Sequence, residues 1–441
     1  MILSVGSVAV SAGKPYLTLL SRFRRDESGN IAVIFAIALL PILAFIGSAI
    51  DYSLAVRAKA KLSASLDAAM LAATGYTAMR GSASDAKTAA TNMFNGQMAA
   101  HNLSANAINI TITDSVSARS VVGSANVVVK TIFMYMFGYP TMTVATSSSA
   151  SASFPTYMDF YVLVDNSPSQ GLGATTADMT KLQNATSDKC AFACHDVYTS
   201  STKKTLQTNS YYQIAKNKGV TMRIDVVRSA TQSLTDTATA SQVVSNQYRM
   251  AVYSLGSDCG SLGLTTVASL SSSMSSVKSS VGSLDLMTIP YSGYNNDQCT
   301  DFDGAMSAMS GVIPTQGDGS STSPQKWLFF VSDGVADYNY PTTCSKTTVS
   351  GGRCQEPLNT ATCTALKARG IKIAVLYTTY LAITNNSWYT TYIAPWRNDI
   401  GTVMKSCASP GYYYEVDSSG SIGAALTALF QQAIASAHLT K

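Results

Sequence analysis

Three separate stretches of the sequence carry oxygen-bearing side chains of the kind that bind a hard metal ion. The first, at residues 159–169, reads DFYVLVDNSPS and contains Asp-x-Ser-x-Ser; the second, at 299–306, reads CTDFDGAM; the third, at 327–334, reads WLFFVSDG. Mg²⁺ prefers oxygen ligands in near-octahedral geometry and usually keeps several waters. Two carboxylates and three hydroxyls therefore predict a site for Mg²⁺, or for Mn²⁺ or Ca²⁺. The candidate ligands are Asp165, Ser167, Ser169, Thr300 and Asp333.

Apolar runs before the first and third groups of ligands indicate how they are brought together. Phe160–Val164 and Trp327–Val331 are typical of strands buried on both faces of a parallel sheet. Parallel strands present their carboxyl ends at one edge, where ligands bind, and Thr300 is expected to open a helix beside that edge. A disulfide at Cys299 would hold Thr300 in ligand position. Because hydroxyls ligate without adding charge, the ion would keep a coordination position for an acidic group of a partner.

An isolated Asp-x-Ser-x-Ser pattern has a simpler interpretation. In a chain rich in Ser and Thr, such a pattern arises by chance and serves as a turn or a helix cap. The presence of Thr300 and Asp333 in the matching order favours the metal site over this alternative.

Residues 155–441 contain apolar runs that alternate with helical patterns, which predicts a doubly wound α/β domain. Strands are expected at DFYVLV, YRMAVYS, WLFFVS, IKIAVLYT and GYYYEV, and helices at RIDVVRSATQSLTDTA, VASLSSSMSSVKSSV, DGAMSAMSGV, TATCTALKARG and GSIGAALTALFQQAIASA. Two insertions, residues 170–212 and 338–356, interrupt this alternation next to the candidate metal edge. Each contains a cysteine pair, and disulfides in such long loops favour an ordered structure.

Residues 31–50 form an uncharged apolar stretch, IAVIFAIALLPILAFIGSAI, which is long enough to cross a bilayer as a helix. A signal peptide is the alternative, but its apolar region would be only roughly 7–15 residues long. We therefore expect a retained single-pass transmembrane helix, in which Pro41 is tolerated. Residues 1–30 would form a short basic stub in the cytoplasm.

The segment at residues 51–154 is expected to combine an exported helix with a small antiparallel sheet. The helical pattern continues without a breaker to Thr74, with Leu and Ala recurring every three or four residues. In AINITIT, at 107–113, isoleucines alternate with polar residues, as in a half-buried strand. The β-branched pattern continues through ANVVVKTIFMYMFGYP and TMTVATSSSASAS, with a turn at Gly138–Pro140 and then a Ser-rich linker.

The charged residues and the cysteines indicate what the chain binds and on which side of the membrane it lies. Only 12% of the 441 residues are charged and the net charge is +5, with no dense basic block after the N-terminus, so nothing indicates nucleic-acid binding. All eight cysteines follow the apolar stretch. Disulfides persist in oxidising compartments, so we expect the N-terminus in the cytoplasm and the bulk of the chain outside it. Basic residues flank both ends of the stretch and add little to this orientation.

The cysteines allow several arrangements. Cys344 with Cys354 is the simplest local loop, and Cys363 and Cys407 could pair across the IKIAVLYT strand. For CAFACH, at residues 190–195, we expect a local disulfide or two separate bridges. The haem-attachment pattern Cys-x-x-Cys-His has one residue fewer, and a zinc site would need reduced thiols, so both of these alternatives are disfavoured.

No set of catalytic residues emerges from the sequence. The three histidines, His101, His195 and His438, stand near no nucleophile motif, and no phosphate-binding glycine loop is present. Asp165 and Asp333 could be read as the paired carboxylates of a hydrolase, but their hydroxyl neighbours suit metal binding better. We expect a protein that is not an enzyme.

The three-part oxygen pattern resembles the metal-ion-dependent adhesion site of von Willebrand factor A domains. That family has Asp-x-Ser-x-Ser after its first strand, a Thr before a mid-domain helix and Asp-Gly after a central strand. The resemblance implies a von Willebrand factor A-like α/β domain in which Ser167 and Ser169 are direct ligands. It also implies that Thr300 ligates directly or through water, and that Asp165 and Asp333 mainly hold coordinated waters.

Residues 24–73, RRDESGNIAVIFAIALLPILAFIGSAIDYSLAVRAKAKLSASLDAAMLAA, resemble the TadG-like members of the TadE/TadG family of tight-adherence (Flp) pilus systems. In that family a basic stub and a Gly precede an apolar span containing a Pro, followed by Asp-Tyr and an Ala-rich helix. Pseudopilin processing favours Glu five residues after the cleavage Gly, whereas Ile34 follows Gly29 at that distance, so an uncleaved anchor is expected.

This second resemblance implies a single-pass protein of the bacterial inner membrane with its bulk in the periplasm. It would assemble or anchor a pilus, and its partners would be pilus machinery or pilin-like proteins, one of which supplies a carboxylate to the metal. The alternative function is a surface adhesin that binds host or matrix protein through the same site.

Overall fold

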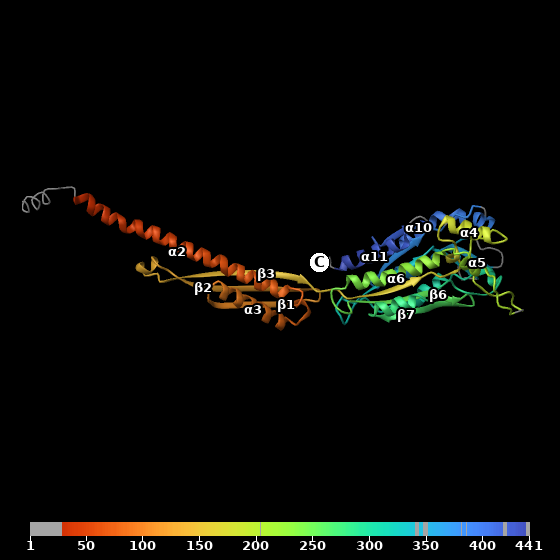
Figure 1. The fold of residues 1–441 in the computed structure, drawn as a ribbon, viewed down its shortest axis with the longest axis horizontal. Helices are drawn as coiled ribbons and strands as arrows, with labels where there is room; N and C mark the ends of the chain where they lie inside the picture. Colours follow the sequence, from red (N-terminus) through yellow and green to blue (C-terminus); the bar gives the residue numbers. More distant parts are fainter. Residues whose placement is uncertain are drawn as a thin grey trace, which may run out of the picture. The chain divides into compact units, whose positions relative to one another are not determined.

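The computed structural model of the protein describes residues 29–202, 204–339, 344–346, 352–380, 382–384, 386–417 and 421–437. The chain divides into two units, one ending at Ala152 and the other beginning at Ser153 (Figure 1). Most of the expected basic stub, and the parts of the insertion at 338–356 that carry residues 340–343 and 347–351, lie outside the described residues.

Unit 1 is built on one long helix, α2 (Gly29–Thr74), which confirms the predicted continuity of the apolar stretch with the segment after it. Its 46 residues extend about 69 Å at the usual helical rise, and Pro41 lies inside the helix without ending it. Within the described part of the chain, this is the one helix long and apolar enough to cross a membrane.

A three-stranded sheet packs on the C-terminal part of α2, with its strands in the order β1 (Ala105–Asp114), β2 (Ala118–Lys130) and β3 (Thr141–Ser153). β1 and β2 pair antiparallel, as the alternating isoleucines predicted. Two expectations were wrong. The segment after Lys130 does not continue the strand but forms a loop with a short 3₁₀ helix, η2 (Met134–Phe137), and the Ser-rich stretch expected as a linker is part of β3.

A second helix of unit 1, α3 (Ala83–Ala100), was not predicted. It follows the short 3₁₀ helix η1 (Ala78–Arg80) and begins with a capping box between Ser82 and Asp85. Its apolar face closes the core of unit 1 against α2 and the sheet. The buried side chains of this core include Leu62, Leu66, Met70, Ala86, Ala90, Phe94, Met98, Ile110 and Val121.

Unit 2 contains a six-stranded sheet in the order β13-β12-β9-β4-β6-β7. The first five strands of this order are parallel to one another, and β7 at the edge is antiparallel to β6. This order is that of the doubly wound α/β fold and confirms the predicted fold class. The strands are β4 (Met158–Val164), β6 (Tyr248–Asp258), β7 (Ser261–Ser271), β9 (Gln325–Ser332), β12 (Lys372–Thr378) and β13 (Tyr413–Val416).

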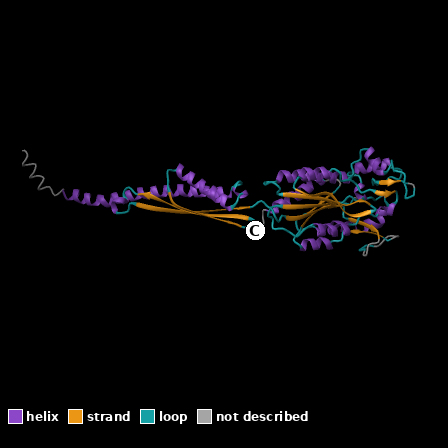
Figure 2. Cartoon of the chain, turned by 90° about the horizontal axis from the view of Figure 1, so that it is seen from below, coloured by secondary structure: helices purple, strands orange, loops and turns teal. Residues whose placement is uncertain are grey.

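Helices cover both faces of this sheet, so β4 is buried throughout (Figure 2). Phe160 and Val162 of β4 lie in the core on one face, whereas Tyr161 and Leu163 lie in the core on the other. The first core is covered by α6 (Arg223–Ser241), α7 (Met274–Val281) and α11 (Ile422–Ala437). The second is covered by α8 (Phe302–Val312), α9 (Ala361–Ala368) and α10 (Arg397–Cys407).

The helix expected at VASLSSSMSSVKSSV is shorter than predicted, because its first half belongs to strand β7 and only residues from Met274 on are helical. Short elements lie in and next to the two insertions. These are η3 (Pro168–Gly171), α4 (Thr176–Ala185), β5 (Asp196–Tyr198), α5 (Tyr211–Asn217), β10 (Val335–Asn339) and β11 (Arg353–Pro357). The remaining elements are β8 (Ile289–Tyr291), η4 (Tyr294–Asp297), the π-helix η5 (Tyr389–Ile393) and η6 (Ala394–Trp396).

Candidate metal centre

The ends of two adjacent central strands bring the first and third groups of candidate ligands together. β4 and β9 are parallel neighbours, with Val164 opposite Val331. The Asp165 N–H donates to the Val331 carbonyl at 2.9 Å, so the loop after β4 begins against the end of β9. The register of β4 and β9 therefore places Asp165 and Asp333 at the same edge of the sheet, as predicted.

Asp165 is a buried carboxylate whose two oxygens brace the surrounding loops. Its Oδ1 accepts the Ser167 N–H at 2.9 Å, and its Oδ2 accepts the Ser332 hydroxyl at 2.7 Å. The Ser332 Oγ in turn accepts the Gly334 N–H at 2.9 Å. Gly334 has φ +75°, and a Cβ there would lie 2.8 Å from side-chain atoms of α10, so this turn requires glycine. The carboxylate thus joins the loop after β4 to the loop after β9.

Two of the three candidate hydroxyl groups lie next to each other. Ser167 Oγ and Ser169 Oγ are 3.0 Å apart; Ser167 is buried and Ser169 is half-buried. Ser169 and Thr300 both line one cavity of about 270 Å³, so the second group of ligands opens to the same space as the first. The five candidate residues therefore gather around one end of the sheet.

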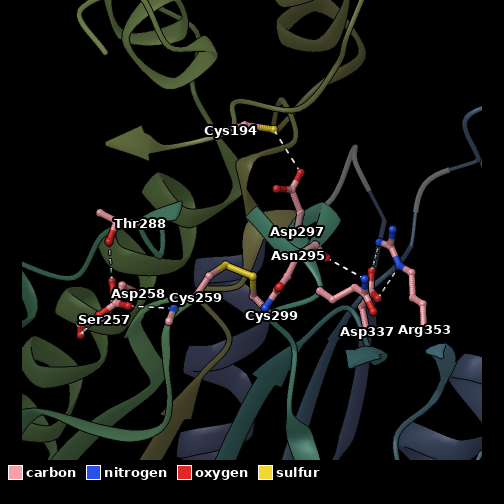
Figure 3. Close-up of a disulfide and its surroundings, with 12 residues drawn as sticks. Cys194, Ser257, Asp258, Cys259, Thr288, Asn295, Asp297, Cys299, Asp337 and Arg353 are labelled. Carbon is pink, nitrogen blue, oxygen red and sulfur yellow. Dashed lines mark hydrogen bonds and ion pairs between the residues drawn. A yellow bond between two sulfur atoms is a disulfide. The ribbon is translucent and has the colours of Figure 1, made fainter. Parts of the chain in front are cut away.

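Thr300 is fixed by backbone and covalent contacts on both sides. Its N–H donates to the Asp337 carbonyl at 2.8 Å, and its own carbonyl accepts the Asp337 N–H at 3.1 Å. The preceding residue, Cys299, is bonded to Cys259 at the end of β6, as Figure 3 shows. A bridge at Cys299 was expected, and its partner is now identified. The helix expected at DGAMSAMSGV begins at Phe302, with Asp301 as its N-cap, so Thr300 lies just before the helix.

The two carboxylates lie in an environment that disfavours their negative charge. Burial, with repulsion from Asp165, raises the pKa of Asp333 to about 7, and Arg223 and a hydrogen bond from Ser169 act in the opposite direction. Burial also raises the pKa of Asp165. Two buried carboxylates that repel each other gain from a nearby cation, and hydroxyls and carboxylates are the donors that a hard cation prefers. The residue set therefore fits a Mg²⁺ ion.

Two residues at this site were missed by the sequence reasoning: the buried Gln170, whose side-chain amide donates to Asp333 Oδ2 at 3.3 Å, and Arg223. Arg223 is the first residue of α6, is buried, and holds its Nη1 3.7 Å from Asp333 Oδ2. Its Nη2 donates to the carbonyls of Thr378 and Thr379 at the end of β12. In the sequence it stands between a methionine and an isoleucine at the start of a helical pattern, and nothing in that spacing links it to Asp333.

The cavity beside the hydroxyls has one polar wall and one largely aromatic wall. On the polar side, Arg353 pairs with both oxygens of Asp337, and Gln355 donates to the same carboxylate at 2.8 Å. The Trp388 indole N–H donates to Gln355 Oε1 at 2.8 Å, and its ring lies 4.8 Å from the Arg353 guanidinium carbon. Phe192, Tyr380, Ile383, Tyr389 and Ile393 complete the apolar side.

Two of the expected disulfide bridges are present, and those expected for CAFACH are not. The bridges Cys344–Cys354 and Cys363–Cys407 are present. The bridges expected for CAFACH are not formed, because Cys190 and Cys194 are free thiols. Cys194 Sγ lies 3.8 Å from Asp297 Oδ2, and burial raises the pKa of both thiols. His195 stacks on Tyr212 at 3.8 Å between ring centroids, and its Nδ1 lies 3.2 Å from the Leu286 carbonyl oxygen.

Comparison with known protein families gives a match to the N-terminal part of the chain. Residues 29–91 match the family model described as Putative Flp pilus-assembly TadE/G-like. The match covers α2, η1 and the first half of α3. No curated protein sequence matches the chain.

Comparison with solved structures gives distant similarities. The vWF domain of the type V pili tip protein Mfa5 from Porphyromonas gingivalis has 10% identity and a TM-score of 0.37, with 65% of this chain and 98% of that chain covered. The PilB minor pilin from Streptococcus sanguinis has 9% identity and a TM-score of 0.34, with 75% and 78% covered. A von Willebrand factor type A structure from Catenulispora acidiphila has 8% identity and a TM-score of 0.30, with 76% and 51% covered. At these TM-scores, the fold assignment of unit 2 depends on its own strand order.

Proposed function

We propose that this chain, whose N-terminal part at residues 29–91 is TadE/G-like, is a membrane-anchored and non-enzymatic component of Flp pilus assembly or anchoring. The apolar part of α2 would be a single span in the bacterial inner membrane, with the N-terminus in the cytoplasm and the rest of unit 1 and all of unit 2 in the periplasm. The three disulfides of unit 2 support this orientation, since disulfides persist in oxidising compartments.

The α/β domain would recognise a partner protein through a metal ion. The observation that carries this proposal is the convergence of two buried, mutually repelling carboxylates and three hydroxyls at one sheet edge. Ser167 and Ser169 would ligate Mg²⁺, Thr300 would ligate directly or through water, and Asp165 and Asp333 would hold coordinated waters. When bound, the ion would supply a positive centre to which a carboxylate of the pilus machinery or of a pilin-like protein binds.

The direct test replaces both serines. We expect Ser167→Ala with Ser169→Ala to abolish Mg²⁺ binding, measured by calorimetric titration of the full-length protein, and to block pilus formation while the protein still accumulates in the inner membrane. The matched control is Ser229→Ala with Ser233→Ala, two exposed serines on α6. Pili that form normally in the Ser167/Ser169 variant would contradict the assembly role.

The adhesin alternative has a distinct outcome in the same strains. The half-apolar cavity beside Ser169 would also suit an acidic group on a host or matrix protein. In that case the Ser167/Ser169 variant would make normal pili but lose attachment. Counting pili by electron microscopy and attached cells in parallel separates the two functions.

A further inference from the structure

We propose that the loop at residues 131–140, which joins β2 to β3 and is called the tip loop below, inserts into the membrane interface as a second membrane contact beside the transmembrane helix. This inference rests on the membrane-anchor part of the proposed function. It is independent of the metal site and of the pilus role.

The tip loop packs against the transmembrane segment itself. A Cβ added to Gly47 would lie 2.5 Å from the Cβ and Cγ of Phe133, so the glycine lets the loop touch the helix backbone. Gly47 lies inside the apolar stretch at residues 31–50, about 4.5 Å before its end at the usual helical rise. A loop in contact with Gly47 must therefore reach the depth at which the apolar stretch leaves the bilayer. Figure 1 shows the β2–β3 connection extending back along α2 toward its N-terminal half.

Asp51 fixes the loop at this depth. Its carboxylate accepts the N–H groups of Ile132, Phe133 and Met134 at 2.8, 2.9 and 2.7 Å. Only 1% of Asp51 is exposed, although it is the first charged residue after the apolar stretch. The loop thus covers a charge that would otherwise face the membrane surface, and the charge in turn satisfies three backbone donors of the loop.

The outer surface of the tip loop is apolar and aromatic. Five large side chains have between 58% and 79% of their surface exposed, and they are Ile132, Tyr135, Met136, Phe137 and Tyr139. Contiguous exposed apolar groups of this kind mark interaction sites in soluble proteins, and Tyr is enriched where protein surfaces meet the lipid headgroups. The composition therefore suits the membrane interface.

The backbone of the tip loop also suits a surface with little water. Met136 N–H donates to the Phe133 carbonyl at 3.1 Å, Gly138 N–H to Tyr135 at 3.1 Å and Tyr139 N–H to Met134 at 3.0 Å. The Thr131 N–H donates to the carbonyl of Pro140 at 3.1 Å, and Pro140 has no N–H of its own. Backbone donors that enter a bilayer need internal partners, which these bonds provide.

Continuity with the helix identifies lipid, and not another protein, as the covering material. Phe45 and Ile46 lie within one turn before Gly47, and 80% and 55% of their surfaces are exposed. These values are similar to those of the large side chains of the tip loop. The bilayer that covers these helix residues would also cover the exposed side chains of the tip loop, which contacts Gly47 through Phe133. One lipid surface thus accounts for both apolar regions of unit 1.

The test uses the full-length protein in phosphatidylcholine vesicles whose acyl chains are brominated near the headgroup end, which quenches tryptophan fluorescence on contact. Met136→Trp places the probe in the tip loop. Val116→Trp is the matched control, because Val116 is 58% exposed in the turn at the other end of the same sheet, about 40 Å away along the 13-residue strand β2. Phe45→Trp is the positive control in the helix.

Because interfacial apolar side chains lie roughly 5–10 Å into the headgroup and acyl boundary, we expect the emission added by Met136→Trp to fall about twofold relative to non-brominated vesicles. The emission added by Val116→Trp should not change. If the emission of Phe45→Trp is quenched and that of Met136→Trp is not, the tip-loop inference is overturned and the membrane anchor stands. If the emission of Met136→Trp is blue-shifted but not quenched, a protein and not lipid covers the loop. Failure to quench Phe45→Trp overturns the anchor, and the tip-loop inference with it.

Discussion

Arg223 Nη1 lies 3.7 Å from Asp333 Oδ2, and both side chains are buried at the end of the sheet where the metal ion is proposed to bind. The guanidinium therefore compensates part of the negative charge of Asp165 and Asp333 before any ion arrives. Arg223 and a divalent cation would share the task of neutralising the same two carboxylates.

Arg223→Met tests this shared role. Removing one partner of a buried ion pair costs about 3–5 kcal/mol, so the α/β domain of the variant should be less stable in EDTA. Mg²⁺ should restore more stability to the variant than it adds to the wild type, because it replaces the lost positive charge. Thermal unfolding with and without Mg²⁺ measures the difference. Arg228→Met is the control, because Arg228 lies about one turn further along α6 and is only partly buried. If Mg²⁺ stabilises the Arg223 variant and the wild type equally, then Arg223 and the metal ion do not neutralise the same carboxylates.

Loss of the Cys259–Cys299 bridge should weaken metal binding. A bridge across 40 residues contributes about 3–4 kcal/mol to stability in the loop-entropy model, and here it also fixes the residue before Thr300. We expect Cys259→Ser with Cys299→Ser to reduce Mg²⁺ affinity several-fold by calorimetric titration.

Cys344→Ser with Cys354→Ser removes the local bridge of the insertion and serves as the control. Unchanged affinity in the Cys259/Cys299 variant, at a temperature where the domain is folded, would show that the bridge does not position Thr300.

The stability of unit 2 should depend on the ionisation of Asp297. Burial, with repulsion from Asp196, raises its pKa from 3.8 to about 6. The folded state therefore holds the proton of Asp297 more tightly than the unfolded state does. Ionisation of Asp297 lowers the free energy of unfolding, and this loss is absent below about pH 4 and complete above about pH 6. Asp297→Asn should match the wild type at low pH and gain about 3 kcal/mol at neutral pH, at 1.36 kcal/mol per pKa unit.

Urea unfolding of the two proteins across this pH range measures that gain. Asn suits the position because the residue has φ +60° and can still accept a hydrogen bond from Cys194. A pH-independent difference between variant and wild type would exclude Asp297 as the titrating group.

Cys190 and Cys194 should remain thiols in the folded protein. Because burial raises the pKa of both, alkylation at neutral pH should be slow in the folded state and fast after denaturation without reductant. Intact-mass measurement should then find two alkylated cysteines per chain and three disulfides. A chain that takes up no label would carry a fourth bridge, as the CAFACH sequence first indicated.

Local patterns in the sequence were sufficient to predict five of the six strands of the central sheet. β4 and β9 are continuous apolar runs followed at once by polar residues, so their position and the edge they share follow from burial alone. α3 carried a comparable signal in Ala86, Ala90, Phe94 and Met98, spaced four residues apart behind a capping serine, but it was overlooked. The metal ligation of the site stays a prediction.

Other features depend on contacts between distant residues. β7 is a polar edge strand, and its pairing with β6 overrides a helical pattern in its second half. The Arg223–Asp333 pair joins residues of different elements, and no spacing rule connects them. The free state of Cys190 and Cys194 likewise follows from the geometry of the insertion and not from their number in the sequence.

The direction of β3 has a mechanical consequence. This strand runs from the tip loop, which contacts α2 at Gly47, to Ser153, the first residue of unit 2, and it lies beside β2. Tension applied to Ser153 from outside the cell membrane would act along the strand axis, while the hydrogen bonds to β2 lie across it. Those bonds would be loaded together in shear and not opened one after another, so unit 1 is built to resist pulling between its anchor and the domain that follows.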